Sequence, residues 1–226
     1  MSAESTKRPL GQWLVLGTGV ILLGLGEYLG LFWAPPEMAM GDVMRIIYIH
    51  VPSGWLALVA FLSTAIFSGL YLRTKTPRYD HIADASAKTG TVFNAMSLAT
   101  GMIWAKPTWG VWWSWDPRLS FTLIMFLLYV AYSALRRFVD DTESRARWAA
   151  VYGIFASVSL PLVYYSANWF RSLHQPHSTP QTVDASMKLP LRINAFAFLF
   201  LMIWFIWRRY ELLRADAAHE STPPPA

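Results

Sequence analysis

The chain has 226 residues, of which 54% are hydrophobic, 15% aromatic and 15% charged. Soluble domains carry about 25% charged residues, so the low charge and the positive mean hydropathy of +0.32 exclude a soluble enzyme. The chain has no cysteine, which excludes disulfides, zinc–thiolate sites, iron–sulfur clusters and haem attached through a paired-cysteine motif.

Long apolar runs predict membrane-spanning helices. In chain order they cover residues 10–33, 52–72, 82–104, 119–135, 148–169 and 191–207. Each run approaches the roughly 20 residues that cross a bilayer, and their continuity excludes the alternating strands of a β-barrel. We therefore expect an all-α, polytopic integral membrane protein with six transmembrane helices and a short amphipathic, tryptophan-rich helix outside the membrane. The expected domain covers residues 1–210 and includes the loop 105–118; a cytoplasmic, partly disordered tail is expected over 211–226.

The distribution of lysine and arginine predicts the orientation of these helices. If the N-terminus is cytoplasmic, twelve of the nineteen lysines and arginines lie inside, with Lys88 near the same face. Six lie outside, namely Arg45, Lys106, Arg118, Arg171, Lys188 and Arg192. This is the positive-inside bias of membrane proteins, so both termini are expected in the cytoplasm. The net charge of +5 therefore needs no nucleic-acid partner, and membrane lipid is the expected surrounding of the spans.

The middle outer loop is rich in tryptophan. It has the sequence Trp109-Gly-Val-Trp-Trp-Ser-Trp-Asp-Pro-Arg-Leu-Ser120 and includes Trp112, Trp113 and Trp115. An aromatic belt at the membrane surface is one interpretation. The helical spacing of Trp109, Trp112, Trp113 and Asp116 favours another, a flat platform for a large planar apolar ligand.

Two polar residues follow these tryptophans. Asp116 precedes Pro117, which is typical of a helix N-cap. Arg118 is expected to pair either with Asp116 or with an anionic group of a ligand.

Two histidines are expected on the same side of the membrane as this loop. His50 lies at the outer start of the second run, and His174 lies just beyond the outer end of the fifth. Two imidazoles on opposite faces of a planar macrocycle hold haem iron without a covalent link to the porphyrin. His177 competes with His174 for this role, and a zinc site formed by all three histidines remains an alternative.

The tryptophan-rich loop resembles the WWD motif of haem-handling proteins. Together with residues 45–52, 165–169, 173–175 and 188–191, it makes the chain similar to the haem exporter protein C (CcmC) family of the cytochrome c maturation system, over nearly its whole length. The resemblance implies that His50 and His174 are the axial haem ligands. It also implies that Trp109, Trp112, Trp113, Trp115 and Asp116 belong to the loop that binds haem and docks a haem chaperone.

The resemblance further implies a function in handling haem. The chain is expected to bind haem b non-covalently at the periplasmic face of a bacterial inner membrane and to present it to the haem chaperone CcmE. The ATP-binding transporter CcmAB and the small membrane subunit CcmD are the other expected partners; the chain has no Walker motif of its own. It is not expected to be an enzyme, apart from an accessory role in the covalent transfer of haem to the chaperone. All six outer cations, Arg118 among them, are candidates for binding the haem propionates. The alternatives are a transporter that carries haem through the bundle, an electron-transfer cytochrome b subunit, and an enzyme that attaches haem to apocytochrome.

Overall fold

The chain folds into a bundle of helices that lie roughly along one axis. The computed structural model describes residues 9–174 and 184–220, with side chains up to Ala218. The helices in these ranges are α1 (Leu10–Tyr28), a π-helical turn (Leu29–Trp33), a 3-10 turn (Asp42–Ile46), α2 (Ile47–Thr74), α3 (Pro77–Trp109), α4 (Pro117–Phe138), α5 (Thr142–Ala156), α6 (Ser159–Trp169) and α7 (Ala185–Glu220). The predicted all-α fold is confirmed.

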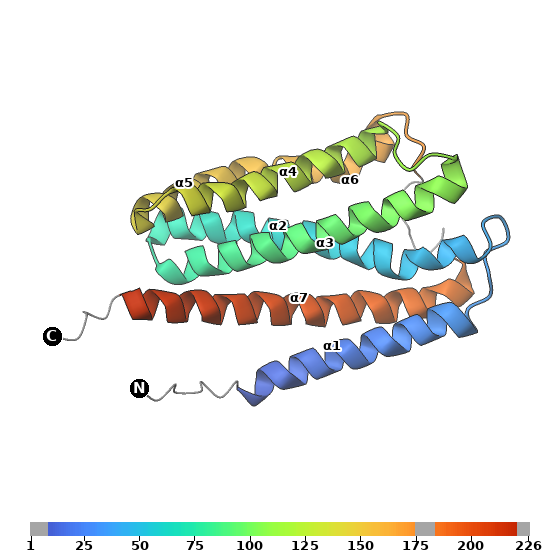
Figure 1. Ribbon diagram of the computed structural model, residues 1–226, viewed down its shortest axis with the longest axis horizontal. Helices are drawn as coiled ribbons and strands as arrows, with labels where there is room; N and C mark the ends of the chain where they lie inside the picture. The colour runs from blue at the N-terminus through green and yellow to red at the C-terminus, as the bar shows by residue number, and fades with distance from the viewer. Residues whose placement is uncertain (1–8, 175–183, 221–226) are drawn as a thin grey trace.

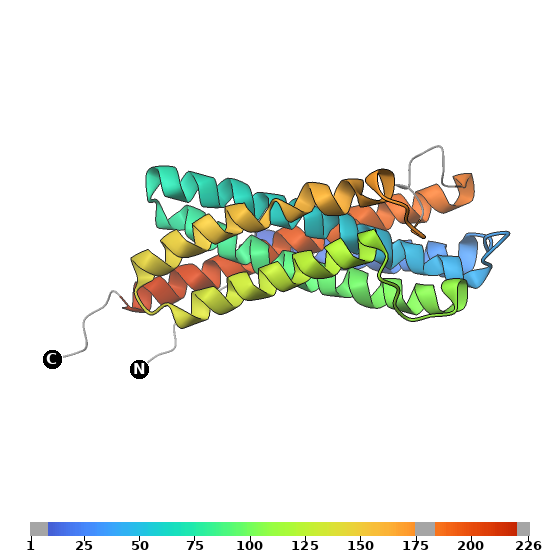
Figure 2. The same cartoon turned by 90° about the horizontal axis from the view of Figure 1, so that it is seen from above.

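The helices form three layers. In Figure 1, α4, α5 and α6 form one layer, α2 and α3 the middle layer, and α7 and α1 the third. The closest pairings join α2 to α3 and α1 to α7, and Figure 2 shows the same elongated bundle from above. The middle layer is therefore shielded on both sides by other helices.

Five of the helical segments are long and apolar enough to cross a membrane. They are Leu10–Trp33, Asp42–Thr74, Pro117–Phe138, Thr142–Trp169 and Ala185–Ala218, so the chain is a polytopic membrane protein. Each contains one of the six predicted spans. The remaining span, 82–104, falls within α3, whose polar residues lower its hydropathy. Several of them, such as Asp84 and Asn94, are buried within the bundle, and membrane crossing by α3 stays a prediction.

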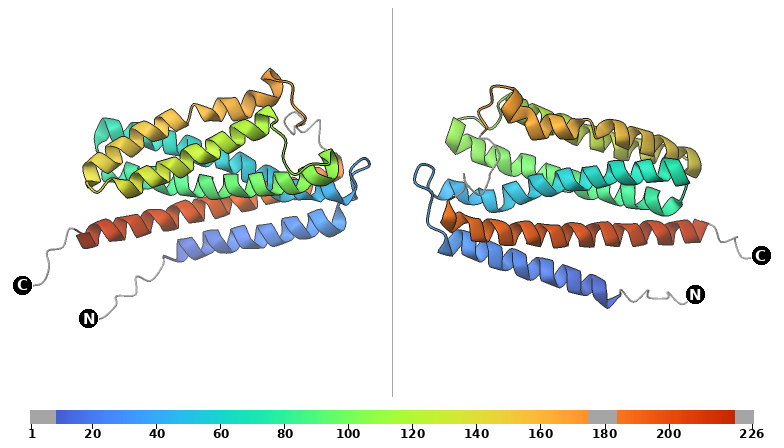
Figure 3. Two further views of the ribbon diagram at one scale, coloured as in Figure 1. Left: turned by 45° about the horizontal axis from the view of Figure 1, so that its top comes forward. Right: turned by 180° about the vertical axis from the view of Figure 1, so that it is seen from behind.

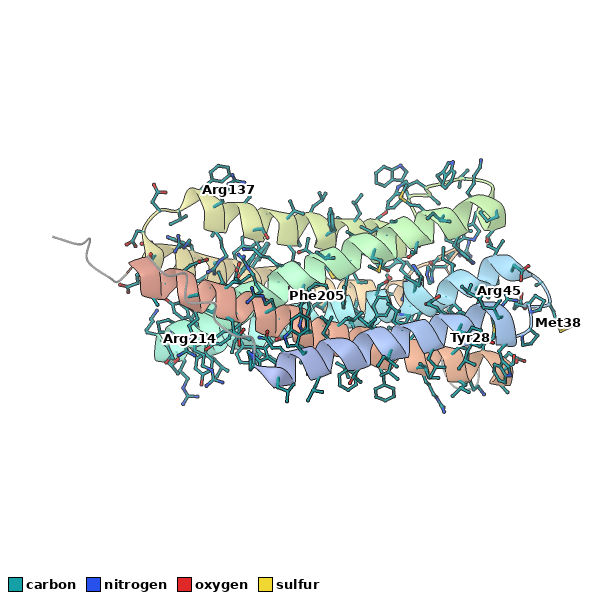
Figure 4. All side chains as sticks on the ribbon, turned by 60° about the horizontal axis from the view of Figure 1, so that its bottom comes forward. Tyr28, Met38, Arg45, Arg137, Phe205 and Arg214 are labelled. Carbon is teal, nitrogen blue, oxygen red and sulfur yellow. The ribbon has the colours of Figure 1, made fainter. Side chains whose placement is uncertain are left out.

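The two ends of the bundle differ. The connections that contain residues 34–46, 110–116 and 170–174 lie at one end, here called the loop end (Figures 1 and 3). The start of α1 and the end of α7 lie toward the other, here called the terminal end. In Figure 4, Met38 and Arg45 lie at the loop end, whereas Arg137 and Arg214 lie at the terminal end. Such an arrangement is the one expected if both termini share a compartment.

A buried ionic cluster joins all three layers near the terminal end. Arg136 of α4 donates to both carboxylate oxygens of Asp80, at 2.6 and 2.7 Å, and its Nε lies 3.1 Å from Asp84. Asp84 also pairs with Lys88 at 3.1 Å and with Arg209 of α7 at 3.4 Å. Asp80 and Asp84 both belong to α3, so this cluster holds the middle layer to the layers above and below it.

The predicted short helix in the tryptophan-rich loop is wrong. Helix α3 continues to Trp109, and residues 110–116 that follow are not helical. The reason is Gly110, whose φ of 77° is left-handed and ends α3, a conformation that glycine adopts at little cost. Asp116 is extended and caps α4, with Pro117 at the first helical position, so the next helix cannot begin earlier.

The last helix extends further than the predicted span. Helix α7 continues to Glu220, so residues 211–220, which the sequence placed in a partly disordered tail, are helical. Residues 221–226 of that predicted tail lie outside the described residues.

Candidate functional site

A cavity opens between α2, α3 and α4 near the loop end. It encloses about 1180 Å³ of empty space, part of which is open to the surroundings, and it is lined mainly by apolar side chains. Its lining includes His50, Trp104, Trp109, Trp113, Arg118 and His174. Both predicted histidines therefore face one cavity.

The side chain of His50 is fixed through one ring nitrogen. His50 lies in the first turn of α2, and its Nδ1 is 3.1 Å from the carbonyl oxygen of Ser97 and 3.0 Å from the hydroxyl of Thr100. A carbonyl only accepts, so Nδ1 carries the hydrogen and donates it. The lone pair is then on Nε2, and metal-binding histidines are commonly oriented in this way by a backbone carbonyl on the opposite nitrogen.

The helix pair α2 and α3 also provides room for this ring. A Cβ atom placed on Gly101 would lie 3.1 Å from Cε1 of His50, which is closer than nearly all real Cβ contacts. The absence of a side chain at Gly101 therefore lets the imidazole lie against α3, within reach of Ser97.

His174 approaches His50 from a separate connection. It follows α6, and the centroids of the two imidazole rings are 6.4 Å apart. A metal–nitrogen bond of about 2.0 Å, with about 1.1 Å from the nitrogen to the ring centre, separates two imidazoles on one metal by about 6.2 Å. The spacing thus fits a single metal ion held between the two rings.

Asp116 connects the tryptophan-rich loop to the segment that carries His174. Its Oδ1 accepts hydrogen bonds from the backbone N–H of Arg118 at 3.0 Å and from the hydroxyl of Ser172 at 2.9 Å. Its Oδ2 accepts from the backbone N–H of Leu173 at 2.6 Å. Asp116 as a whole is only 4% exposed. Asp116 therefore caps α4 as predicted and also binds the residues next to His174, a contact that the sequence did not predict.

The four tryptophans of the loop do not form one platform. Trp109 and Trp113 line the cavity, whereas Trp112 and Trp115 are 54% and 78% exposed and are absent from its lining. The ring of Trp104 contacts that of Trp109 edge to face at 5.1 Å and also lines the cavity. Sequence reasoning missed Trp104 because it placed a helix break before Trp109, whereas one continuous helix carries both rings.

Only one of the six outer cations lines the described part of the cavity, and that is Arg118. Its Nη1 is buried and has no hydrogen-bond partner among the described residues. Arg45 instead donates to Asp42 and to the carbonyls of Gly30 and Ala34. A buried cation with an unused donor fits an anionic group of a ligand.

The zinc alternative depends on a residue that the structure does not describe. His177 lies outside the described residues, so a three-histidine site stays a hypothesis. Within the described ranges, no group of three or more histidine, aspartate or glutamate side chains is placed to hold a metal ion.

Comparison with known proteins identifies relatives along almost the entire chain. Residues 3–222 match the family described as Heme exporter protein C. The chain is 38% identical over 208 residues to a heme exporter protein C of Bradyrhizobium diazoefficiens, covering 89% of this chain and 78% of that protein. It is 37% identical over 192 residues to the heme exporter protein C of Escherichia coli K12, covering 84% and 77% of the two chains. A putative cytochrome c biosynthesis ccmC-like mitochondrial protein of Marchantia polymorpha is 33% identical over 204 residues, covering 88% and 87%.

Proposed function

The chain belongs to the heme exporter protein C family, and on that premise we propose that it binds haem b at the loop end and presents it to the haem chaperone CcmE. The observation that carries the proposal is the 6.4 Å spacing of the His50 and His174 rings beside a cavity lined mainly by apolar side chains. Haem supplies an iron with two axial positions, which two neutral imidazoles occupy without a covalent bond to the porphyrin. Because no covalent bond holds the porphyrin, the haem can later be released to a partner.

The residues around the histidines have separate roles in this proposal. Nε2 of His50 binds the iron from one side, because Nδ1 is held by Ser97. His174 binds from the other side. Trp104, Trp109 and Trp113 pack against the porphyrin and exclude water, since all three line the cavity.

Two tryptophans of the loop are exposed and do not line this cavity. Trp112 and Trp115 therefore present apolar surface to the surroundings. We assign this surface to docking of CcmE, with CcmAB and CcmD as further partners of the complex. The proposed site is periplasmic and both termini are cytoplasmic; the two described ends of the chain lie together at the end opposite the cavity, which supports this orientation.

Replacing Arg118 with alanine is expected to weaken haem binding about tenfold or more while the spectrum stays low-spin. A hydrogen bond to a charged group contributes about 1.5–3 kcal/mol, and Nη1 of Arg118 is the buried donor available to a propionate. Titration of the purified chain with haem measures the affinity. Arg171→Ala is the matched control, because Arg171 is exposed and does not line the cavity. Equal affinities for Arg118→Ala and wild type would exclude Arg118 as the propionate ligand.

The proposed function is tested with the purified chain in detergent or lipid nanodiscs. With haem added, we expect the absorption spectrum of a low-spin iron with two imidazole ligands, followed by transfer of haem to purified CcmE. Sealed vesicles that contain only this chain are expected not to accumulate haem. Haem flux into such vesicles without transfer to the chaperone would instead support the transporter alternative.

A further inference from the structure

The hydrogen bonds of Asp116 exceed what a helix cap requires. Capping of α4 uses one oxygen, Oδ1, which accepts from the N–H of Arg118. The same carboxylate accepts from Ser172 and Leu173, and the hydroxyl of Ser172 in turn accepts from the backbone N–H of His174 at 3.0 Å. Asp116 thus reaches the backbone of His174 through one intervening side chain.

The segment that carries His174 is not helical, and its backbone is bound by side chains. Helix α6 ends at Trp169, and Phe170 is extended. The described amides of Leu173 and His174 donate to side chains, the carboxylate of Asp116 and the hydroxyl of Ser172. Hydrogen bonds to a buried carboxylate are about twice as strong as bonds between neutral groups. The carboxylate is therefore the strongest described anchor of this segment.

We propose that Asp116 is a positioning residue for His174: its carboxylate fixes the 172–174 segment so that the imidazole is held opposite His50 before haem arrives. The inference rests on the proposed function, because it assigns His174 as an axial ligand. This role of Asp116 is separate from capping. One side chain, at the end of the tryptophan-rich loop, would then fix both the start of α4 and the segment that carries one axial ligand. Asp116 itself need not touch haem.

The variant Asp116→Asn separates positioning from capping. Asparagine caps helices about as well as aspartate, so α4 keeps its start. The amide has one acceptor oxygen in place of two, and its NH2 group cannot accept from the N–H of Leu173 or replace the charge. The matched control is Asp141→Asn, since Asp141 caps α5 through Ser144 at 2.8 Å and lies at the terminal end. Hydrogen bonds from the side chain and backbone of Ser144 lower the pKa of Asp141, so both variants replace a carboxylate that accepts several hydrogen bonds.

Two measurements test the proposal. In the haem-free protein, hydrogen exchange of the amides in residues 172–174 is expected to be faster in Asp116→Asn than in wild type. With ferric haem, this variant is expected to bind about 10–100-fold more weakly, the range for groups that orient a metal ligand. It should also contain a high-spin fraction that free imidazole converts to low-spin. Asp141→Asn should match wild type in all of these measurements.

The outcomes distinguish this inference from the proposed function. Unchanged exchange and an unchanged spectrum in Asp116→Asn would overturn the positioning role, and so would equal effects of Asp116→Asn and Asp141→Asn. A wild-type chain without a two-imidazole spectrum would overturn the proposed function, whatever the exchange data show. Ser172→Ala, which removes the link between Asp116 and the N–H of His174 but leaves the cap, is expected to shift both readouts in the same direction by less.

Discussion

Replacing His50 with alanine is expected to remove the low-spin haem spectrum and to weaken haem binding by more than about 100-fold. Loss of a group that only orients a metal ligand costs about 10–100-fold, so loss of the ligand itself should cost more. No other histidine of the described residues can take the place of His50. The described part of the cavity contains only one other histidine, His174, which is already the proposed second ligand. The iron would keep a single imidazole and become high-spin.

The same experiment on His174 tests whether that residue or His177 is the second ligand. His174→Ala is expected to give the same high-spin spectrum as His50→Ala, and free imidazole should restore the low-spin form in both. His177→Ala should keep the wild-type spectrum. A further control is His81→Ala, since His81 lies in the first turns of α3 near Tyr210, whereas the residues of α3 that line the cavity lie between Asn94 and Trp109. A low-spin spectrum retained by both His50→Ala and His174→Ala would refute the assignment of the axial ligands.

The positions of the histidines were predictable from the sequence because they depend on topology. Four predicted spans, the second to the fifth, lie between His50 and His174 in the sequence. Because four is an even number of membrane crossings, both histidines were expected on the same side of the membrane. The apolar runs predicted the helical segments well for the same reason. The segment Leu10–Trp33 coincides with its predicted span, and the other predicted spans lie within helical segments, although the span 148–169 is divided between α5 and α6. The length of an apolar run is enough to place a membrane-spanning helix, and no knowledge of side-chain contacts is needed.

Some features of the site could not be predicted, because they depend on the backbone conformation of one residue or on contacts between residues far apart in the sequence. Helical spacing in the tryptophan-rich loop suggested a shared face, but the left-handed Gly110 ends the helix after Trp109 and separates the rings. The link from Asp116 to Leu173 joins residues 57 positions apart, and no local pattern marks it. The burial of Asp84 in the middle layer likewise depends on which helices cover α3.

Replacing Arg136 with methionine is expected to lower the free energy of unfolding by about 3–5 kcal/mol. Removing one partner of a buried ion pair leaves the other charge buried without compensation, and that penalty is of this size. Here the loss affects two carboxylates, because Arg136 pairs with Asp80 through two hydrogen bonds and with Asp84 through Nε. For a chain of this length, each kcal/mol corresponds to about 2–4 °C, so the midpoint of thermal unfolding should fall by at least about 6 °C.

The neighbouring arginine supplies a control for this prediction. Arg137 is exposed, and Figure 4 shows it at the surface of the terminal end, so Arg137→Met should shift the midpoint by much less. Adding Asp80→Asn to Arg136→Met removes one of the uncompensated charges and should recover part of the lost stability, while Asp84 keeps Lys88 and Arg209. Because the ionic cluster and the cavity lie at opposite ends of α3, Arg136→Met should retain the low-spin spectrum below its unfolding midpoint. If the double variant unfolds no later than Arg136→Met, packing around the guanidinium and not its charge holds the three layers together.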